Sequence, residues 1–121
     1  MTQNEGETEK KKKNPITVII IEDFKLTRVG LRCALNENED IDVIGEAEDA
    51  TAGLKLVQQY NPKVVLMDLG LPGMNGIEAM VKCKELRLGT KIIALTSHDR
   101  CEEVLAALTS GANAYCLKDI D

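Results

Sequence analysis

The stretch that decides the fold is VVLMDLGLPGMNG, residues 64–76. Its first four residues are apolar without alternation, a pattern that predicts a strand buried on both faces, as in a parallel sheet. Asp68 ends this strand, and a loop rich in Pro and Gly follows. A charge is costly inside such a strand, but at its carboxyl end it lies where open α/β sheets bind ligands. We therefore interpret Asp68 as an exposed functional group and not as part of the core.

Outward from this strand, the chain alternates between strand and helix patterns from Pro15 onward. Short connections and regular alternation predict a parallel sheet with helices on both faces. The chain ends at Asp121, four residues after the last expected strand, so we expect the closing helix to be truncated or replaced by cover from a partner. The expected strands are 16–21, 42–46, 64–68, 91–96 and 114–117, and the expected helices are 25–36, one through Leu54 and Val57, 75–87, and one through Val104 and Leu108.

The helix over 25–36 carries an apolar stripe that should face the sheet. Its members are Leu26, Val29, Gly30 and Cys33.

Length and charge limit the classes of function. A chain of 121 residues forms one domain. Residues 1–14 are polar and lysine-rich, so we expect a disordered arm before a folded domain over 15–121. The net charge is -5, and because the arm carries +1, the folded part carries about -6. Such a surface argues against direct binding of nucleic acid.

The cysteines point to a reducing compartment. Cys33, Cys83, Cys101 and Cys116 form no Cys-x-x-Cys pair, and His98 is the single histidine. This spacing excludes metal-finger and redox motifs and favours reduced thiols in a cytoplasmic protein. No apolar run approaches the length of a signal peptide or membrane span, so no membrane role is expected.

Polar residues end three further strands. Glu22 and Asp23 follow the first strand, Thr96 ends the fourth, and Lys118 follows the fifth. Because the carboxyl ends of parallel strands share one edge, these side chains can converge with Asp68. Neighbouring carboxylates repel unless a cation intervenes, and all-oxygen ligands suit Mg2+. A hydroxyl and an ammonium group beside them suit a phosphoryl group.

Each of these residues also has an ordinary structural interpretation. Asp68 could be a turn aspartate, and Glu22-Asp23 could cap the helix that begins near Lys25. Thr96 and Lys118 are unremarkable alone. The joint placement at four strand ends favours function.

With these motifs in place, residues 16–118 resemble the receiver domain of two-component response regulators. The resemblance rests on the acidic pair Glu22-Asp23, the loop at 68–76, Thr96-Ser97, Tyr115 and Lys118. It implies a flavodoxin-like (CheY-like), doubly wound, five-stranded parallel sheet with strand order 2-1-3-4-5. The Lys118-Asp119 pair and the Gly-Met-Asn-Gly sequence are most similar to receivers of the NarL/FixJ type.

The resemblance also implies a mechanism and a cofactor. Asp68 would accept a phosphoryl group from a phosphohistidine on a sensor histidine kinase. Asp23, Asp68 and the backbone carbonyl of Gly70 would bind Mg2+, with Glu22 acting through water. Lys118 and Thr96 would contact the phosphoryl oxygens. Such a module is not an enzyme beyond its own phosphorylation and dephosphorylation.

A switch and an output follow from the same resemblance. Movement of Thr96 would let Tyr115 rotate inward, which changes the surface of the fourth helix and fifth strand. Receivers of this type usually precede a DNA-binding domain, so DNA would be bound only through an output domain absent from this chain. A homodimer is a further family expectation.

Three departures and three alternatives accompany this interpretation. Glu22 replaces a more common Asp, Asp119 replaces a common Pro, and Gly70 leaves no side chain to shield a phosphoryl group from water. One alternative, a phosphatase with an aspartyl nucleophile, typically needs a second carboxylate where Gly70 stands. A second alternative, a flavodoxin-like cofactor binder, would need a phosphate-cradling loop after the first strand, where this chain has Glu22-Asp23 instead. The third alternative, a receiver-like interaction module that takes no phosphate, is not excluded by the sequence.

Overall fold

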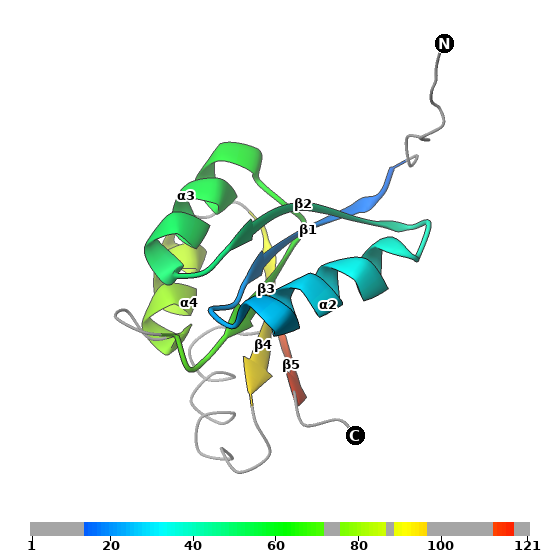
Figure 1. Ribbon diagram of the computed structural model, residues 1–121. Helices are drawn as coiled ribbons and strands as arrows, with labels where there is room; N and C mark the ends of the chain where they lie inside the picture. The colour runs from blue at the N-terminus through cyan, green and yellow to red at the C-terminus, as the bar shows by residue number, and fades with distance from the viewer. Residues whose placement is uncertain (1–13, 72–75, 87–88, 97–112, 118–121) are drawn as a thin grey trace.

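The computed structural model describes residues 14–71, 76–86, 89–96 and 113–117. Its five strands form one parallel sheet in the order β2-β1-β3-β4-β5 (Figure 1). The predicted doubly wound fold and its strand order are confirmed. The strands are β1 (Ile16–Ile21), β2 (Ile41–Ala47), β3 (Val64–Asp68), β4 (Lys91–Thr96) and β5 (Ala114–Leu117).

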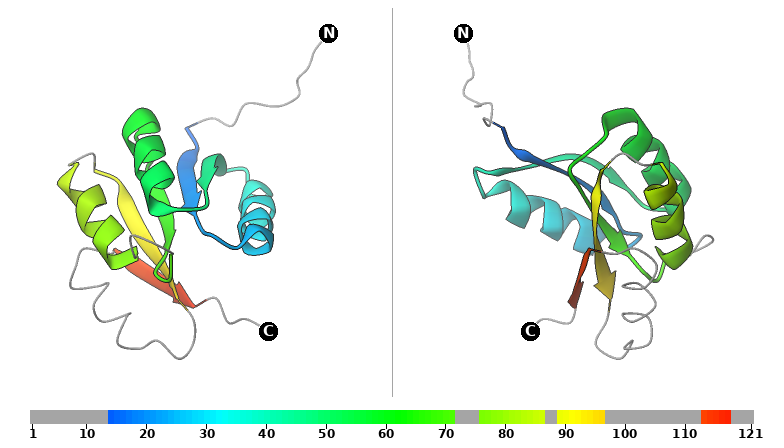
Figure 2. Two further views of the ribbon diagram at one scale, coloured as in Figure 1. Left: turned by 60° about the vertical axis from the view of Figure 1, so that its left-hand side comes forward. Right: turned by 180° about the vertical axis from the view of Figure 1, so that it is seen from behind.

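Helices cover both faces of the sheet, as Figure 2 shows. Helix α2 (Lys25–Asn36) lies on one face, and α3 (Ala50–Tyr60) and α4 (Gly76–Glu85) lie on the other. None of the helices in the described part of the chain has the length and apolarity needed to cross a membrane. The expected helix through Val104 and Leu108, residues 1–13 of the expected arm over 1–14, and the end of the chain at 118–121 lie outside the described residues.

Alternate residues of the central strands fill two separate cores. In β1, Ile19 and Ile21 pack with residues of α3 and α4, whereas Val18 and Ile20 pack on the α2 side. In β3, Val65 and Met67 join the first core, while Leu66 joins the second. Both faces of β3 are therefore buried, as its unbroken apolar pattern predicts.

The predicted apolar stripe of α2 is wrong. Leu26 is 74% exposed and Cys33 is exposed, whereas Leu31 and Leu35 pack against the core under this helix. Leu31 and Leu35 are four residues apart and so lie on one helix face. The helix is rotated from the predicted phase, and Arg28 consequently points toward the edge of the sheet, where it bonds to β2.

Helix α3 approaches β1 closely because Gly53 has no side chain. A Cβ on Gly53 would lie 2.3 Å from Ile21 Cδ1 and 2.6 Å from Ile21 Cγ1. Ile21 is fully buried, so it has little room to move. The small residue at this point fixes how closely the helix packs on the sheet.

We expect Gly53→Ala to destabilise the domain, because the added methyl group overpacks the core at a cost of about 1–3 kcal/mol. Gly30→Ala is the matched control: nothing lies within 4 Å of its Cβ position, and alanine in an exposed helix should stabilise by about 0.5–1 kcal/mol. Urea unfolding of both variants measures the difference. Equal effects of the two substitutions would contradict close packing at Gly53.

Cys33 and Cys83 should differ in reactivity. Cys33 is exposed, whereas Cys83 is buried, and burial raises the pKa of the Cys83 thiol above its ordinary value of 9.0. Alkylation of the native protein at pH 8, followed by peptide mass mapping, should therefore modify Cys33 first. Because the folded state holds the Cys83 proton more tightly, this contribution to stability is present below pH 9.0 and is lost as the pH rises further. Faster modification of Cys83 would contradict its burial.

Candidate functional site

Strand β3 delivers Asp68 to the carboxyl edge of the sheet. Asp68 is paired with Leu95 of β4, and the next residue, Leu69, donates its N–H to the Leu95 carbonyl at 3.0 Å. The Asp68 side chain is only 4% exposed. The expectation of an exposed aspartate is therefore wrong in its degree of exposure: the side chain sits at the strand end but is covered by its neighbours.

The loop after β3 orients the Asp68 carboxylate. The Gly70 N–H donates to Asp68 Oδ1 at 3.0 Å, which fixes the rotation of the carboxylate. Gly70 itself is exposed, and a Cβ at this position would lie 3.7 Å from the same oxygen. A larger side chain at residue 70 would thus stand against the carboxylate, and glycine leaves that side open.

The loop after β1 brings the other two carboxylates. Glu22 is fully buried, and its N–H donates to the Ala47 carbonyl at the end of β2 at 3.0 Å. Its Oε2 accepts the Phe24 N–H at 3.0 Å, while Asp23 is exposed. Phe24, not the acidic pair, occupies the N-cap position of α2, and it makes no side-chain cap bond. Neither Glu22 nor Asp23 is thus the N-cap residue, although the Glu22 carboxylate satisfies the N–H of the residue that is.

Glu22, Asp23 and Asp68 converge as the sequence predicts. One carboxylate oxygen from each of them lies within 4.8 Å of the other two. Two of these three groups are buried, where like charges repel more strongly than in water. Three hard oxygen donors, with no sulfur or nitrogen donor among them, match the ligands that Mg2+ prefers. The cluster fits a divalent cation.

The remaining predicted site residues are placed only in part. Thr96 is the last residue of β4, one position beyond the Leu95 that pairs with Asp68. Tyr115 lies in β5, where its backbone pairs with Ala94. Lys118 lies outside the described residues. The structure therefore brings three carboxylates together, while the contacts of Thr96, Tyr115 and Lys118 stay predictions.

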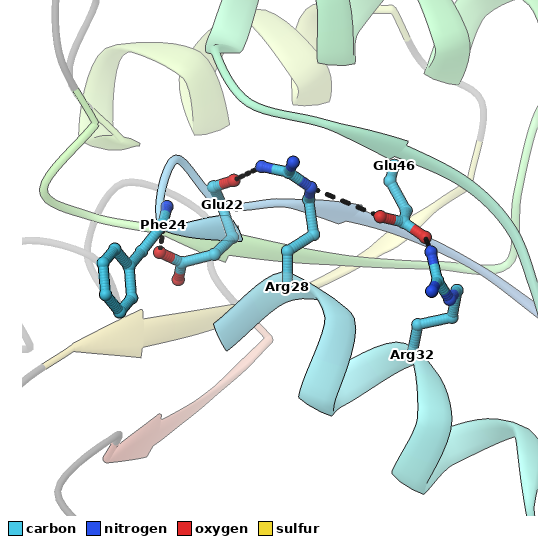
Figure 3. A network of polar contacts seen from close by, with 5 residues as sticks. All are labelled: Glu22, Phe24, Arg28, Arg32 and Glu46. Atoms are coloured by element: carbon cyan, nitrogen blue, oxygen red, sulfur yellow. Dashed lines mark hydrogen bonds and ion pairs between the residues drawn. The ribbon is translucent and has the colours of Figure 1, made fainter. Parts of the chain in front are cut away.

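A polar network beside the carboxylates was not predicted from the sequence. Figure 3 shows Arg28 and Arg32 of α2 on either side of Glu46 of β2. Arg28 Nη1 also donates to the backbone carbonyl of Glu22 at 2.8 Å. The hydrogen bond and charge of Glu46 raise the pKa of Arg32 above its ordinary value. Two arginines four residues apart on a helix next to a strand glutamate are the only signal that could have indicated this network.

Comparison with known proteins identifies similar chains. The family model for the response regulator receiver domain matches residues 18–121. The nitrate/nitrite response regulator protein NarL of Escherichia coli K12 is 36% identical over 107 residues, which are 88% of this chain and 50% of that protein. The transcriptional regulatory protein LiaR of Bacillus subtilis is 43% identical over 104 residues, which are 85% of this chain and 49% of that protein. The chain thus spans about half the length of these relatives.

A solved structure has the same fold. The isolated receiver domain of RcsB from Salmonella enterica serovar Typhimurium, determined in the presence of the phosphomimetic BeF3-, superposes with a TM-score of 0.81 at 29% identity. The match covers 89% of this chain and 80% of that one.

Proposed function

This chain belongs to the response regulator receiver domain family, and from that premise we propose that it accepts a phosphoryl group on Asp68 from a sensor histidine kinase. It is a receiver domain of the NarL type in a two-component system. Members of this family are signalling proteins and not conventional enzymes. The proposal concerns the residue, the cation and the switch by which this particular chain would work.

The convergence of Glu22, Asp23 and Asp68 is the observation that carries the proposal. Their oxygens gather within 4.8 Å at the edge of the sheet where ligands bind in folds of this kind. The RcsB receiver, which is similar in fold, was solved with a phosphomimetic, and this supports a phosphoryl-binding role for the corresponding edge here.

Asp68 would act as the nucleophile. A carboxylate oxygen of Asp68 forms a bond to the phosphorus atom as the bond from phosphorus to the histidine nitrogen breaks, and the imidazole leaves with the electron pair. The Gly70 N–H holds Oδ1 at 3.0 Å, so the carboxylate meets the phosphorus in a fixed orientation. Positioning of this kind supplies much of the rate in phosphoryl transfer.

Mg2+ is the cation that this site would hold. Glu22, Asp23, Asp68 and the carbonyl of Gly70 supply oxygen donors, in keeping with the hard-ligand preference of that ion. When bound, Mg2+ would neutralise the carboxylates and the negative charge of the transferred group. The buried Glu22 carboxylate, tethered to the Phe24 N–H, would stay in place whether or not the ion is present.

The remaining site residues would convert phosphorylation into a change of surface. Lys118 and Thr96 would contact phosphoryl oxygens, and inward rotation of Tyr115 would follow the movement of Thr96. The surface around the fourth helix and fifth strand would then differ between the two states.

The relatives that this chain matches are longer than it is. Because the chain spans about half of its curated relatives, we propose that its native context includes a DNA-binding output domain. The partners would be a sensor histidine kinase, DNA through that output domain, and a second copy of the receiver. A cytoplasmic location fits these partners.

Intact mass spectrometry after incubation with phosphoramidate tests the proposed function. With Mg2+ we expect a gain of one phosphoryl group, and with a chelator we expect none. Uptake in the chelator would contradict the role of the cation. No uptake in Mg2+ by protein shown to be folded would favour a receiver-like interaction module that takes no phosphate.

A further inference from the structure

We propose that Arg28 is a positioning residue for the cation site, because it fixes the peptide group between Glu22 and Asp23. This inference rests on the proposed function in assigning the site to Mg2+. The Nη1 of Arg28 donates to the backbone carbonyl of Glu22 at 2.8 Å (Figure 3).

The hydrogen bond from Arg28 to the Glu22 carbonyl also restrains Asp23, because the two residues share a planar peptide bond. The Glu22 carbonyl and the Asp23 nitrogen belong to one planar unit, so fixing the carbonyl also fixes the start of Asp23. The Glu22 N–H is already held by the Ala47 carbonyl at 3.0 Å. Both polar groups of the Glu22 backbone are therefore held, the N–H by Ala47 and the carbonyl by Arg28. This restraint matters most for Asp23, which is exposed and lies in a loop.

Glu46 holds Arg28 in place. Arg28 Nε donates to Glu46 Oε1 at 3.3 Å, and the Arg28 side chain is only 14% exposed. A guanidinium group can bond two acceptors at once in a fixed arrangement, which a lysine ammonium group does not reproduce. Arg28 thus ties the loop after β1 to the neighbouring strand β2.

Arg32 is a natural control within the same network. It also pairs with Glu46, but it is 41% exposed and, among the described contacts, bonds to neither Glu22 nor Asp23. Removing either arginine removes one positive charge from the network around Glu46. A change in charge alone would strengthen cation binding in both variants, whereas loss of positioning would weaken it only in the Arg28 variant.

The test is the affinity for Mn2+, used as a spectroscopic probe and measured by electron paramagnetic resonance of the free ion. Arg28→Met should raise the Kd about tenfold, which is typical when a residue that orients metal ligands is lost. Arg32→Met should bind as tightly as the wild type or more tightly. Arg28→Lys, which keeps the charge but has a single ammonium group, should show an intermediate loss.

Phosphorylation gives a second readout. The Arg28→Met variant should need more Mg2+ for half-maximal phosphorylation by phosphoramidate, with a nearly unchanged rate at saturating Mg2+. If the wild type takes no phosphoryl group, the proposed function fails, but the Mn2+ titration still decides the role of Arg28. Wild-type affinity for Mn2+ in Arg28→Met, or equal losses in both arginine variants, would overturn the proposal.

Urea unfolding without metal identifies any variant that does not fold. If Arg28→Met is such a variant, Arg28→Lys decides, since it retains the charge and the long side chain. Unchanged Mn2+ affinity in folded Arg28→Lys would overturn the proposal in that case.

Discussion

We expect the Asp68→Asn variant to take up no phosphoryl group, whether the donor is a small molecule or a kinase. Asparagine has nearly the shape of aspartate but its amide is a poor nucleophile, so the first bond to phosphorus does not form. Intact mass spectrometry of both proteins, side by side in Mg2+ and phosphoramidate, measures the result. The loss should be complete within the detection limit of the method.

The structure explains why this variant should fold. The amide oxygen of asparagine can still accept the Gly70 N–H that Asp68 Oδ1 accepts at 3.0 Å. The substitution also removes one of three negative charges that lie within 4.8 Å of one another. At such distances a pair of like charges costs on the order of 1 kcal/mol even when water screens it well.

Asp68→Asn should therefore unfold at a higher urea concentration than the wild type in the absence of metal. Phosphoryl uptake that persists in the variant would mean that another group is the acceptor, and the exposed Asp23 would be the first to examine. If Asp68→Asn does not fold, its loss of uptake does not identify the acceptor. Glu22→Gln and Asp23→Asn then test the two neighbouring carboxylates, and uptake that persists in both variants would leave Asp68 as the acceptor in the cluster.

Strand positions and the gathering of carboxylates could be predicted because both follow from local patterns. An apolar run without alternation requires cover on both faces, and β3 has that cover. Parallel strands place their carboxyl ends at one edge, so Glu22, Asp23 and Asp68 had to approach one another. The strand order, in contrast, came from the resemblance to a family and not from the apolar pattern.

The phase of α2 and the contacts of Arg28 could not be read from the sequence. The predicted stripe counted Leu26 as a core residue, yet it is 74% exposed. The half-buried Arg28 guanidinium on this helix finds its two acceptors elsewhere: Glu46 of β2, 18 residues away, and the backbone carbonyl of Glu22. Apolar periodicity along one helix holds no information about a partner on another element, so the rotation of the helix and its link to the Glu22 carbonyl emerge only from the assembled fold.

We expect Mg2+ to stabilise the wild-type domain strongly, and Glu22→Gln to reduce that stabilisation. Ligand that binds the folded state at 100 times its Kd adds about 2.7 kcal/mol to the free energy of unfolding. For a domain of this size, that is on the order of 10 °C in Tm. Thermal unfolding followed by circular dichroism, with and without Mg2+, measures the shift.

Glu22→Gln should raise the melting temperature of the metal-free domain but reduce the increase that Mg2+ produces. Glutamine can still accept the Phe24 N–H through its amide oxygen, and it removes a fully buried negative charge beside Asp23 and Asp68. Without metal, the variant should therefore melt at a higher temperature than the wild type. With Mg2+, it should gain less, because a neutral oxygen attracts the ion less strongly than a carboxylate.

Two controls separate this effect from general charge screening. NaCl at matched ionic strength should reproduce little of the Mg2+ shift, since buried charges are screened only weakly by salt. Glu48→Gln removes an exposed carboxylate that is not part of the acidic cluster, so its response to Mg2+ should match the wild type. A Glu22→Gln variant that is less stable without metal, yet gains as much from Mg2+ as the wild type, would mean that Glu22 serves the fold through its hydrogen bonds and not the cation through its charge.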